Sequence, residues 1–281
     1  MERISVLSMF RDSEKYLHDT FERLEALDKA TPEFEFEYFF YENDSVDNTV
    51  PLLENWLRNK PGRLITELLN KPKFGSVPAQ ERMNDLTYYR NTLLNENKPF
   101  SSSYSLLLDS DVQFEPDLIQ QYIGCLDDQI VMITPNVLQN IKCKMCDCKT
   151  DSYYDSWALI DRYGNHGMTW SSNPFYHPDD RAKWESNNPV SVKSAFGGCP
   201  MIKTSSLNKV EWSTDSGCEH WNFCRDVIND GIIVVAPTVV VKVELGASVI
   251  EGLNDDHVSA VISQQHRRLS MFKNADLEGL F

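Results

Sequence analysis

The sequence predicts an α/β fold, in which a mostly parallel sheet carries helices on both of its faces. Strand-like and helix-like segments alternate through the first half of the chain, which is typical of parallel βα units. The chain has 281 residues, 41% of them hydrophobic, and can therefore bury a large core. No apolar stretch approaches the roughly 20 residues that cross a bilayer. We expect a single domain that comprises residues 1–281.

The first elements are predicted by their side-chain periodicity. Residues 3–8 form an expected strand, and residues 13–28 an expected helix, because apolar residues recur there at helical spacing behind Ser13, which can cap. Residues 33–41 alternate charged and aromatic side chains, which indicates a half-buried strand. A helix over residues 46–59 follows a turn rich in Asp, Asn and Ser.

The alternation continues to about residue 135. Residues 63–69 read as a strand and residues 79–97 as a long helix. An apolar run over residues 104–108 predicts a buried strand. A short helix over residues 116–124 opens with proline, and residues 129–134 form the next strand.

The second half is less regular. Residues 141–190 are rich in Asp, Ser, Asn, Pro, Tyr and Trp, and we expect loops inserted over the cleft. The elements expected after them are strand-like residues 190–204, a helix over 218–230, a β-branched run over 232–244 that Pro237 divides, and a helix over 255–272.

Charge excludes several classes of function. The formal net charge is −15 and no basic patch is visible, which excludes nucleic-acid binding and argues against adhesion to anionic lipid. An acidic protein that binds a diphosphate needs a cation and a few local arginines. The chain starts directly in strand-like sequence without a signal peptide. We therefore expect the cytoplasm of a cell or of an infected host cell; a lumenal enzyme without its anchor is the alternative. The oligomeric state is left open.

The seven cysteines are an odd number, which indicates mostly reduced thiols. Cys143, Cys146 and Cys148 form a C-x2-C-x-C cluster. Structural zinc normally has four ligands, and no second pair follows. A zinc site, a disulfide and a plain reduced loop all remain open, with the loop preferred.

The most informative motif is Asp109-Ser110-Asp111, directly after the apolar run. Two carboxylates at the carboxyl end of a parallel strand suit a hard cation such as Mg²⁺ or Mn²⁺. Such a cation neutralises a diphosphate, so we expect a nucleotide-activated donor, most plausibly a nucleotide sugar. The alternative is a solvated turn.

Two further segments support a ligand site at this edge. Residues 41–49 place seven polar side chains, besides Tyr41, at the end of a strand, where ligands bind in open α/β sheets; helix capping by one or two of them is the alternative. Arg82 and Arg90 are eight positions apart and fall close to one helix face. Guanidinium groups bind phosphate, and Arg90, followed by Asn91, is the preferred candidate over a solvated helix face.

Together these motifs resemble GT-A glycosyltransferases. The resemblance rests on Ser8 and Arg11 after the first strand, residues 42–49, Arg90-Asn91 and the D-x-D. It is nearest to the family-2-like and capsule-associated mannosyltransferase group, and also to virus-encoded capsid-glycan transferases such as the algal-virus xylosyltransferases. It covers residues 3–135 well and 190–245 loosely. The resemblance implies a Rossmann-like sheet with a nucleotide-sugar-binding half, residues 1–135, and an acceptor half, residues 136–281.

The resemblance also implies roles for individual residues. Asn43 is expected to reach the nucleobase, Asp109 to lie near ribose and metal, and Asp111 to ligate the metal directly. Glu42 and Asn43 stand where family-2 members have Asp-Asp, which weakens the nucleobase assignment. The expected nucleotide-sugar contacts are Ser8, Arg11, Glu42, Asn43, Arg90, Asp109, Ser110, Gly197 and Gly198.

The acceptor half contributes candidates for catalysis. Gly197 and Gly198 permit close approach of a ligand to the backbone, or form a bulge. An inverting transferase needs a carboxylate base, which similar enzymes place at the start of the helix near residue 218. Glu219 is the first candidate and Asp215 the second; the alternative is capping by Asp215 and a helix-dipole role for Glu219. His257, like His220, is a candidate third metal ligand.

Residues and resemblance together predict a metal-dependent glycosyltransferase with Mn²⁺ or Mg²⁺ as cofactor. It would move a sugar from a nucleotide sugar, such as a UDP-sugar with UDP-xylose as one candidate, to a hydroxyl of a glycan or glycoprotein acceptor, with inversion. The alternatives are a retaining GT-A transferase, a sugar-phosphate nucleotidyltransferase and a catalytically dead glycan-binding protein. Residues 8–13 lack the glycines that a nucleotidyltransferase would show.

Overall fold

The computed structural model describes residues 2–74, 79–143, 149–215, 217–243 and 248–250. The strands in these residues are β1 (Glu2–Phe10), β2 (Phe34–Asn43), β3 (Gly62–Glu67), β4 (Tyr104–Asp109), β5 (Val112–Gln113), β6 (Ile130–Cys143), β7 (Lys149–Tyr153), β8 (Ile160–Asp161), β9 (Val190–Ser194), β10 (Met201–Lys203), β11 (Ile232–Val243) and β12 (Ser248–Ile250). The helices are α1 (Glu14–Ala30), α2 (Thr49–Leu57), α3 (Gln80–Asn95), α4 (Leu118–Ile123), α5 (Pro178–Glu185), α6 (Thr204–Leu207) and α7 (Glu219–Val227). The helix expected over residues 255–272 lies outside the described residues.

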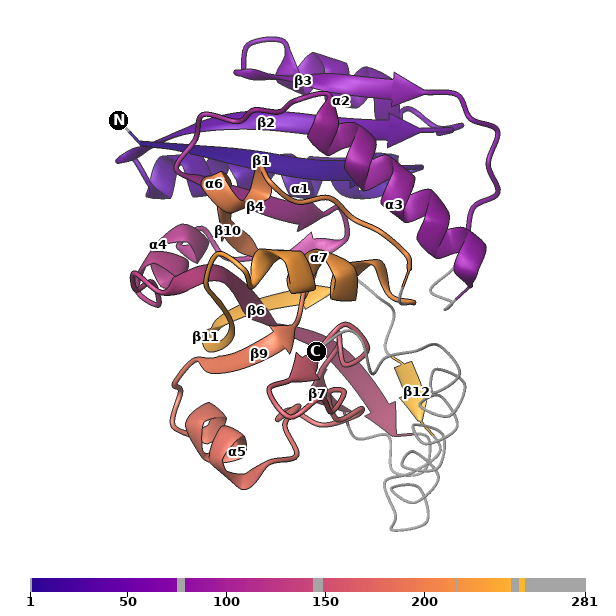
Figure 1. The fold of residues 1–281 in the computed structure, drawn as a ribbon. Coiled ribbons are helices and arrows are strands. Elements are labelled where there is room, and N and C mark those ends of the chain that lie inside the picture. The colour runs from indigo at the N-terminus through magenta and orange to yellow at the C-terminus, as the bar shows by residue number, and fades with distance from the viewer. Residues whose placement is uncertain (1, 75–78, 144–148, 216, 244–247, 251–281) are drawn as a thin grey trace.

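A single sheet runs through the described part of the chain in the order β3-β2-β1-β4-β10-β6-β11-β9-β8 (Figure 1). β1 pairs in parallel with β2 and β4, and β2 in parallel with β3. Beyond β4 the sheet is mixed, because β10 is antiparallel to both β4 and β6. Short connections such as that between β6 and β7 allow only antiparallel neighbours. The predicted α/β fold is confirmed, and the parallel pairing is concentrated in the first half.

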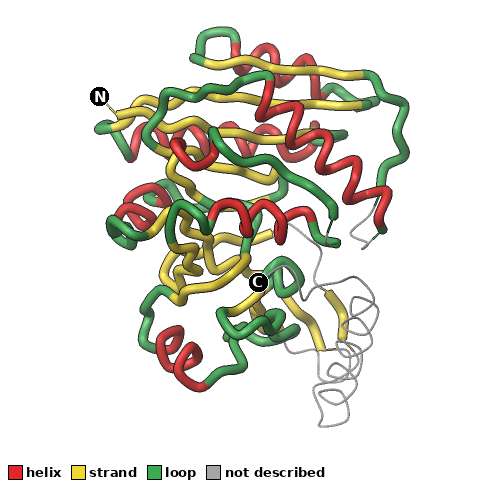
Figure 2. Tube along the Cα trace, in the orientation of Figure 1, coloured by secondary structure: helices red, strands yellow, loops and turns green. Residues whose placement is uncertain are grey.

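Helices cover both faces of the parallel half, as predicted. α1 and α2 pack together on one face, where Phe21 of α1 stacks on Trp56 of α2 at 4.8 Å. α3 lies on the opposite face, beside α7 (Figures 1 and 2). The strands between them are buried on both faces, which is why β1 and β4 read as nearly continuous apolar runs.

The register of the parallel strands sets where the site can form. Met9 of β1 lies opposite Tyr41 of β2 on one side and opposite Asp109 of β4 on the other. Phe10 lies opposite Glu42. The polar residues that end β2 and β4 therefore lie at one edge of the sheet.

The region 141–190 is more ordered than the expected loops. β7 pairs with the end of β6, which extends well beyond the predicted strand at 129–134, and α5 forms a short helix. Aromatic packing stabilises it, since Trp184 contacts Tyr153 and Phe175 edge-on. The expectation of loops alone was wrong, because these long-range aromatic contacts have no local periodicity.

Smaller differences concern element ends. α2 begins at Thr49 rather than residue 46, and Pro237 lies within β11 at a register shift between Ala236 and Val240. Ser13 occupies the N-cap of α1, but its hydroxyl donates to the carbonyl of Arg11 and makes no cap bond. Among the described residues, no helix combines the length and the apolar character needed to cross a membrane.

Truncation of the core between α1 and the sheet should be costly. Leu24 is 0% exposed, so Leu24→Ala should lower the free energy of unfolding by about 2–5 kcal/mol, measured by urea denaturation. Leu52 of α2 is 36% exposed and offers a matched control, for which Leu52→Ala should cost about 0.5 kcal/mol or less. Equal losses would show that α1 is not held by its buried face.

Candidate active site

Asp109 ends β4 at the edge of the sheet where β1 and β2 also end. Its side chain is 33% exposed, and its Oδ1 lies 3.4 Å from Nη1 of Arg90. Its backbone N–H donates to the carbonyl of Gly198 at 2.7 Å. The end of β4, helix α3 and the loop after β9 therefore meet at Asp109.

Arg90 reaches this carboxylate from α3 with only 10% of its side chain exposed. The guanidinium lies 4.9 Å from the ring centre of Phe196 and 5.9 Å from that of Trp212. Its Nε has no hydrogen-bond partner among the described residues. Since a guanidinium has five N–H donors, the contact with Asp109 leaves Arg90 with capacity for a second anion.

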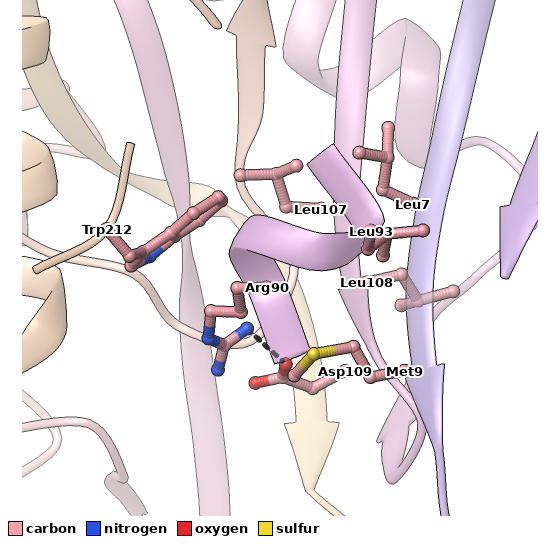
Figure 3. Close-up of a pocket in the computed structure, with 8 residues that line it drawn as sticks. All are labelled: Leu7, Met9, Arg90, Leu93, Leu107, Leu108, Asp109 and Trp212. Atoms are coloured by element: carbon pink, nitrogen blue, oxygen red, sulfur yellow. Dashed lines mark hydrogen bonds and ion pairs between the residues drawn. The ribbon is translucent and has the colours of Figure 1, made fainter. Parts of the chain in front are cut away.

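Arg90 and Asp109 form the polar end of a small cavity (Figure 3). The remaining residues that line it are apolar: Leu7, Met9, Leu93, Leu107, Leu108 and Trp212. Apolar surroundings lower the local dielectric and strengthen the attraction between the two charges. This attraction holds the side chains of Arg90 and Asp109 together.

Gly197 and Gly198 form a tight turn against Asp109. Their φ angles are +68° and +66°, in the left-handed region that favours glycine. A Cβ on Gly198 would lie 2.8 Å from Cγ2 of Val112 and 3.3 Å from Oδ2 of Asp109. The turn thus brings backbone close to the Asp109 carboxylate; the expected contact of these glycines with a ligand stays a prediction.

Asp155 joins this centre and was missed in the sequence. Its Oδ2 accepts the N–H of Gly197 at 2.8 Å, and its carboxylate also accepts the N–H of Ala158. Removal from water raises the pKa of Asp155 to about 7, and the nearby carboxylates of Asp109 and Glu219 add to this rise against the two N–H donors. Asp155 stands in the irregular insertion, where no motif or periodicity marked it.

Glu219 is the first residue of α7 and lies near the same centre. It is 3% exposed, and its Oε1 lies 3.5 Å from Nε2 of His220. The His220 ring stacks on Phe196 at 3.9 Å. Burial, with the positive charges of Arg90 and Arg82, lowers the pKa of His220 well below its usual value, so this imidazole is neutral.

The two candidate bases differ in position. A buried carboxylate at a helix N-terminus beside a neutral histidine can accept a proton from a bound hydroxyl. Asp215, the second candidate, is exposed on the loop that precedes α7. Glu219, unlike the exposed Asp215, is buried and lies near enough to Asp155 to contribute to its raised pKa.

The expected nucleotide contacts lie along the ends of β1 and β2. Ser8 is buried, and its hydroxyl has no partner within the described ranges. Arg11 donates to the carbonyls of Lys71 and Pro72 at 2.7 and 3.2 Å. Asn43 is 3% exposed and donates its amide N–H to Asp44 at 3.0 Å.

Many polar side chains of residues 41–49 form hydrogen bonds with the backbone of this segment and of neighbouring segments. Glu42 accepts the N–H of Ser45 at 2.7 Å. Asp44 accepts the N–H groups of residues 69, 70 and 71; burial opposes ionisation, but these donors and the amide of Asn43 together lower the pKa of Asp44. Asp47 accepts from Glu14 and Thr49. Local hydrogen bonds thus account for more of this segment than capping alone predicted.

The D-x-D carboxylates have the chemistry of a cation site. Asp111 is half-buried one residue beyond Ser110, and Asp109 is partly exposed. Carboxylate oxygens are the donors that Mg²⁺ and Mn²⁺ prefer, so the donor set fits such an ion. In the described residues, three close ligand atoms occur only on exposed α1, at His18, Asp19 and Glu22. His257 lies outside the described residues.

Two tryptophans of the second half are buried by packing. Trp184 is packed in the core of the insertion, and Trp221 is buried with its indole N–H on the carbonyl of Trp157. Cys125, Cys199, Cys218 and Cys224 are free thiols, in line with the expected reduced state. The cluster from Cys143 to Cys148 has no described side-chain contacts, so its role stays open.

Comparison with known proteins gives one family and a set of folds. The sequence matches the family described as Cryptococcal mannosyltransferase 1 over residues 5–226. No curated protein matches the chain.

Solved structures share the fold at low identity. S. aureus TarS 1-349 is 14% identical, with 98% of this chain and 73% of that chain covered and a TM-score of 0.50. The same protein in complex with UDP is 15% identical with the same coverage and TM-score. Glucosyl-3-phosphoglycerate synthase from Mycobacterium tuberculosis, in complex with Mn²⁺, UDP and phosphoglyceric acid, is 12% identical over 95% of this chain and 77% of that chain. Its TM-score is 0.44.

The raised pKa of Asp155 should make stability depend on pH. The folded chain keeps this carboxyl protonated up to about pH 7, whereas the unfolded chain ionises it near 3.8. The folded state therefore binds the extra proton in this interval, and the contribution of Asp155 to the free energy of unfolding falls as pH rises through it. Asp155→Asn cannot ionise, so its melting temperature should rise relative to that of the wild type between about pH 4 and about pH 7. A pH-independent difference in thermal unfolding would contradict the shift.

Proposed function

The chain belongs to the Cryptococcal mannosyltransferase 1 family and is a glycosyltransferase, and we propose that it transfers a sugar from a UDP-sugar to a hydroxyl of a glycan acceptor. A divalent cation assists in this proposal, and the sugar is transferred with inversion. UDP-xylose is the donor that we would test first, and a glycoprotein glycan is the expected acceptor.

One observation carries the proposal: the carboxylates of Asp109 and Glu219, from the two halves of the chain, both lie near Asp155. Asp109 comes from the end of β4, and Glu219 from the start of α7. Both lie close enough to Asp155 to raise its pKa. Arg90 contacts Asp109, and its positive charge helps to lower the pKa of His220, the neighbour of Glu219. Donor chemistry and acceptor chemistry thus have candidate residues on either side of one centre.

The choice of a uridine donor is supported by the fold. TarS, which shares this fold, was solved in complex with UDP. Arg90 retains donors for a phosphate, and its desolvated position strengthens its hold on negative charge. Asn43 stands at the expected nucleobase end, buried at the end of β2.

Asp109 and Asp111 would hold the cation, Mn²⁺ or Mg²⁺. Their hard oxygen donors, one residue apart at an exposed strand end, suit either ion. When bound, the cation neutralises charge on the departing nucleoside diphosphate. His257 remains a candidate third ligand.

Glu219 is the base in this proposal. Its burial at the N-terminus of α7 and its contact with the neutral His220 orient the carboxylate. It would take the proton of the acceptor hydroxyl while Arg90 stabilises the negative charge that develops on the donor side. A base on the side opposite the leaving group gives inversion.

A donor panel tests the assignment directly. With Mn²⁺, the wild type should hydrolyse a UDP-sugar slowly in a panel of nucleotide sugars that includes UDP-xylose, and Asp111→Ala should reduce this turnover to background because a metal ligand is lost. Asp19→Ala, in the exposed acidic group on α1, is the control and should retain turnover. Normal turnover by Asp111→Ala would rule out the metal assignment, and loss in Asp19→Ala instead would move the cation to α1.

Removal of the base should affect the chemical step. Glu219→Gln should lower transfer by about 10²–10⁴-fold with little change in donor affinity or melting temperature, since the amide is nearly isosteric. Asp215→Asn removes the same charge at an exposed position and should retain transfer. The reverse pattern would make Asp215 the base. Full activity in both variants would indicate a retaining mechanism, which NMR of the anomeric configuration of the product would reveal.

A further inference from the structure

We propose that Asp155 is a positioning residue of the donor site, which holds the Gly197-Gly198 turn against the Asp109 carboxylate. The inference rests on the proposed function, because it assigns Asp155 to the donor side of that same centre. It gives the irregular insertion a part in catalysis beyond covering the sheet.

A short chain of contacts connects Asp155 to Asp109. Oδ2 of Asp155 accepts the N–H of Gly197 at 2.8 Å. The next residue, Gly198, accepts the N–H of Asp109 at 2.7 Å through its carbonyl. The turn is therefore held at both of its glycines, once by a side chain and once by the backbone of the D-x-D strand.

The Gly197-Gly198 turn also limits where the Asp109 carboxylate can lie. A Cβ on Gly198 would lie 3.3 Å from Oδ2 of Asp109, so the backbone of the turn passes close to this oxygen. Oδ1 of the same carboxylate lies 3.4 Å from Arg90. Asp109 is thus enclosed between Arg90 on one oxygen and the glycine turn on the other. If the turn moves away, the carboxylate becomes free to rotate towards Arg90.

A comparison with Asp161 separates this role from ordinary turn capping. Asp161 belongs to the same insertion, is 1% exposed, and accepts the N–H groups of Tyr163 and Asn165 at 2.8 Å each. Its bonds are local. Asp155 also accepts from the nearby Ala158, but its bond to Gly197 spans 42 positions and ends at the centre. Capping explains Asp161 fully and Asp155 only in part.

The test measures UDP binding by isothermal titration in the presence of Mn²⁺. Loss of a residue that orients a metal or phosphate ligand typically costs about 10–100-fold, so Asp155→Ala should weaken UDP binding by that factor. Asp155→Asn should fall between wild type and Asp155→Ala, because its amide oxygen still accepts the N–H of Gly197. Asp161→Asn, the matched control, should bind UDP as the wild type does.

Steady-state kinetics and a second variant, in the glycine turn itself, test the same inference. Asp155→Ala should raise the donor KM and leave the acceptor KM unchanged, a split that a general loss of folded protein would not produce. Gly198→Ala should weaken UDP binding as well, because its methyl group would lie 2.8 Å from Cγ2 of Val112 and 3.3 Å from Oδ2 of Asp109 and would displace the turn. This variant keeps the inference testable if Asp155→Ala folds poorly.

The outcomes separate the inference from the function on which it rests. A wild type that binds no UDP with Mn²⁺ would overturn the proposed donor, and the inference with it. A wild type that binds UDP, with Asp155→Ala and Gly198→Ala unchanged, would overturn the inference alone. Equal losses in Asp155→Asn and Asp161→Asn, with donor and acceptor KM affected alike, would reduce Asp155 to a turn cap.

Discussion

The parallel register of β1 with β2 and β4 is the constraint on which the rest of the structure depends. It places Met9 opposite both Tyr41 and Asp109, so that two strand ends and their polar residues meet at one edge. Fully buried residues such as Ile4 and Leu106 keep this register, since a slip by one residue would turn each side chain to the other face. The site is thus positioned by the packing of the core before any polar contact contributes.

The centre at that edge concentrates like charges at a cost. Asp109, Asp155 and Glu219 are three acidic groups in a chain of net charge −15, and Arg90 is the buried cation that contacts Asp109. Backbone N–H groups offset part of the cost at Asp155, and the N-terminus of α7 favours negative charge at Glu219. Even so, the pKa of Asp155 stays raised to about 7. Strain of this kind is characteristic of functional sites, where stability is given up for chemistry.

How far the sequence could predict this arrangement depended on the range of each interaction. The strands and helices up to about residue 135 follow from local periodicity. The D-x-D was marked by residue type and position, whereas Glu219 was a candidate through the resemblance to glycosyltransferases. Asp155 could not be found, because its meaning lies in a hydrogen bond to Gly197 across 42 positions. The role of Asp44 was hidden for the same reason, since its partners follow β3. The motifs indicated candidate site residues, whereas long-range packing determines which of these residues lie close together.

The two adjacent residues Arg90 and Asn91 show how the halves of the chain become one catalytic unit. Arg90 faces Asp109, on the donor side. The Asn91 amide donates to the carbonyl of Trp212 at 2.8 Å and accepts its N–H at 2.8 Å, which binds α3 to the segment that leads to Glu219. Any movement of Glu219's segment relative to α3 would have to break this pair of bonds. One helix therefore sets the geometry between donor carboxylate and candidate base, so neither half can be treated as a separate module.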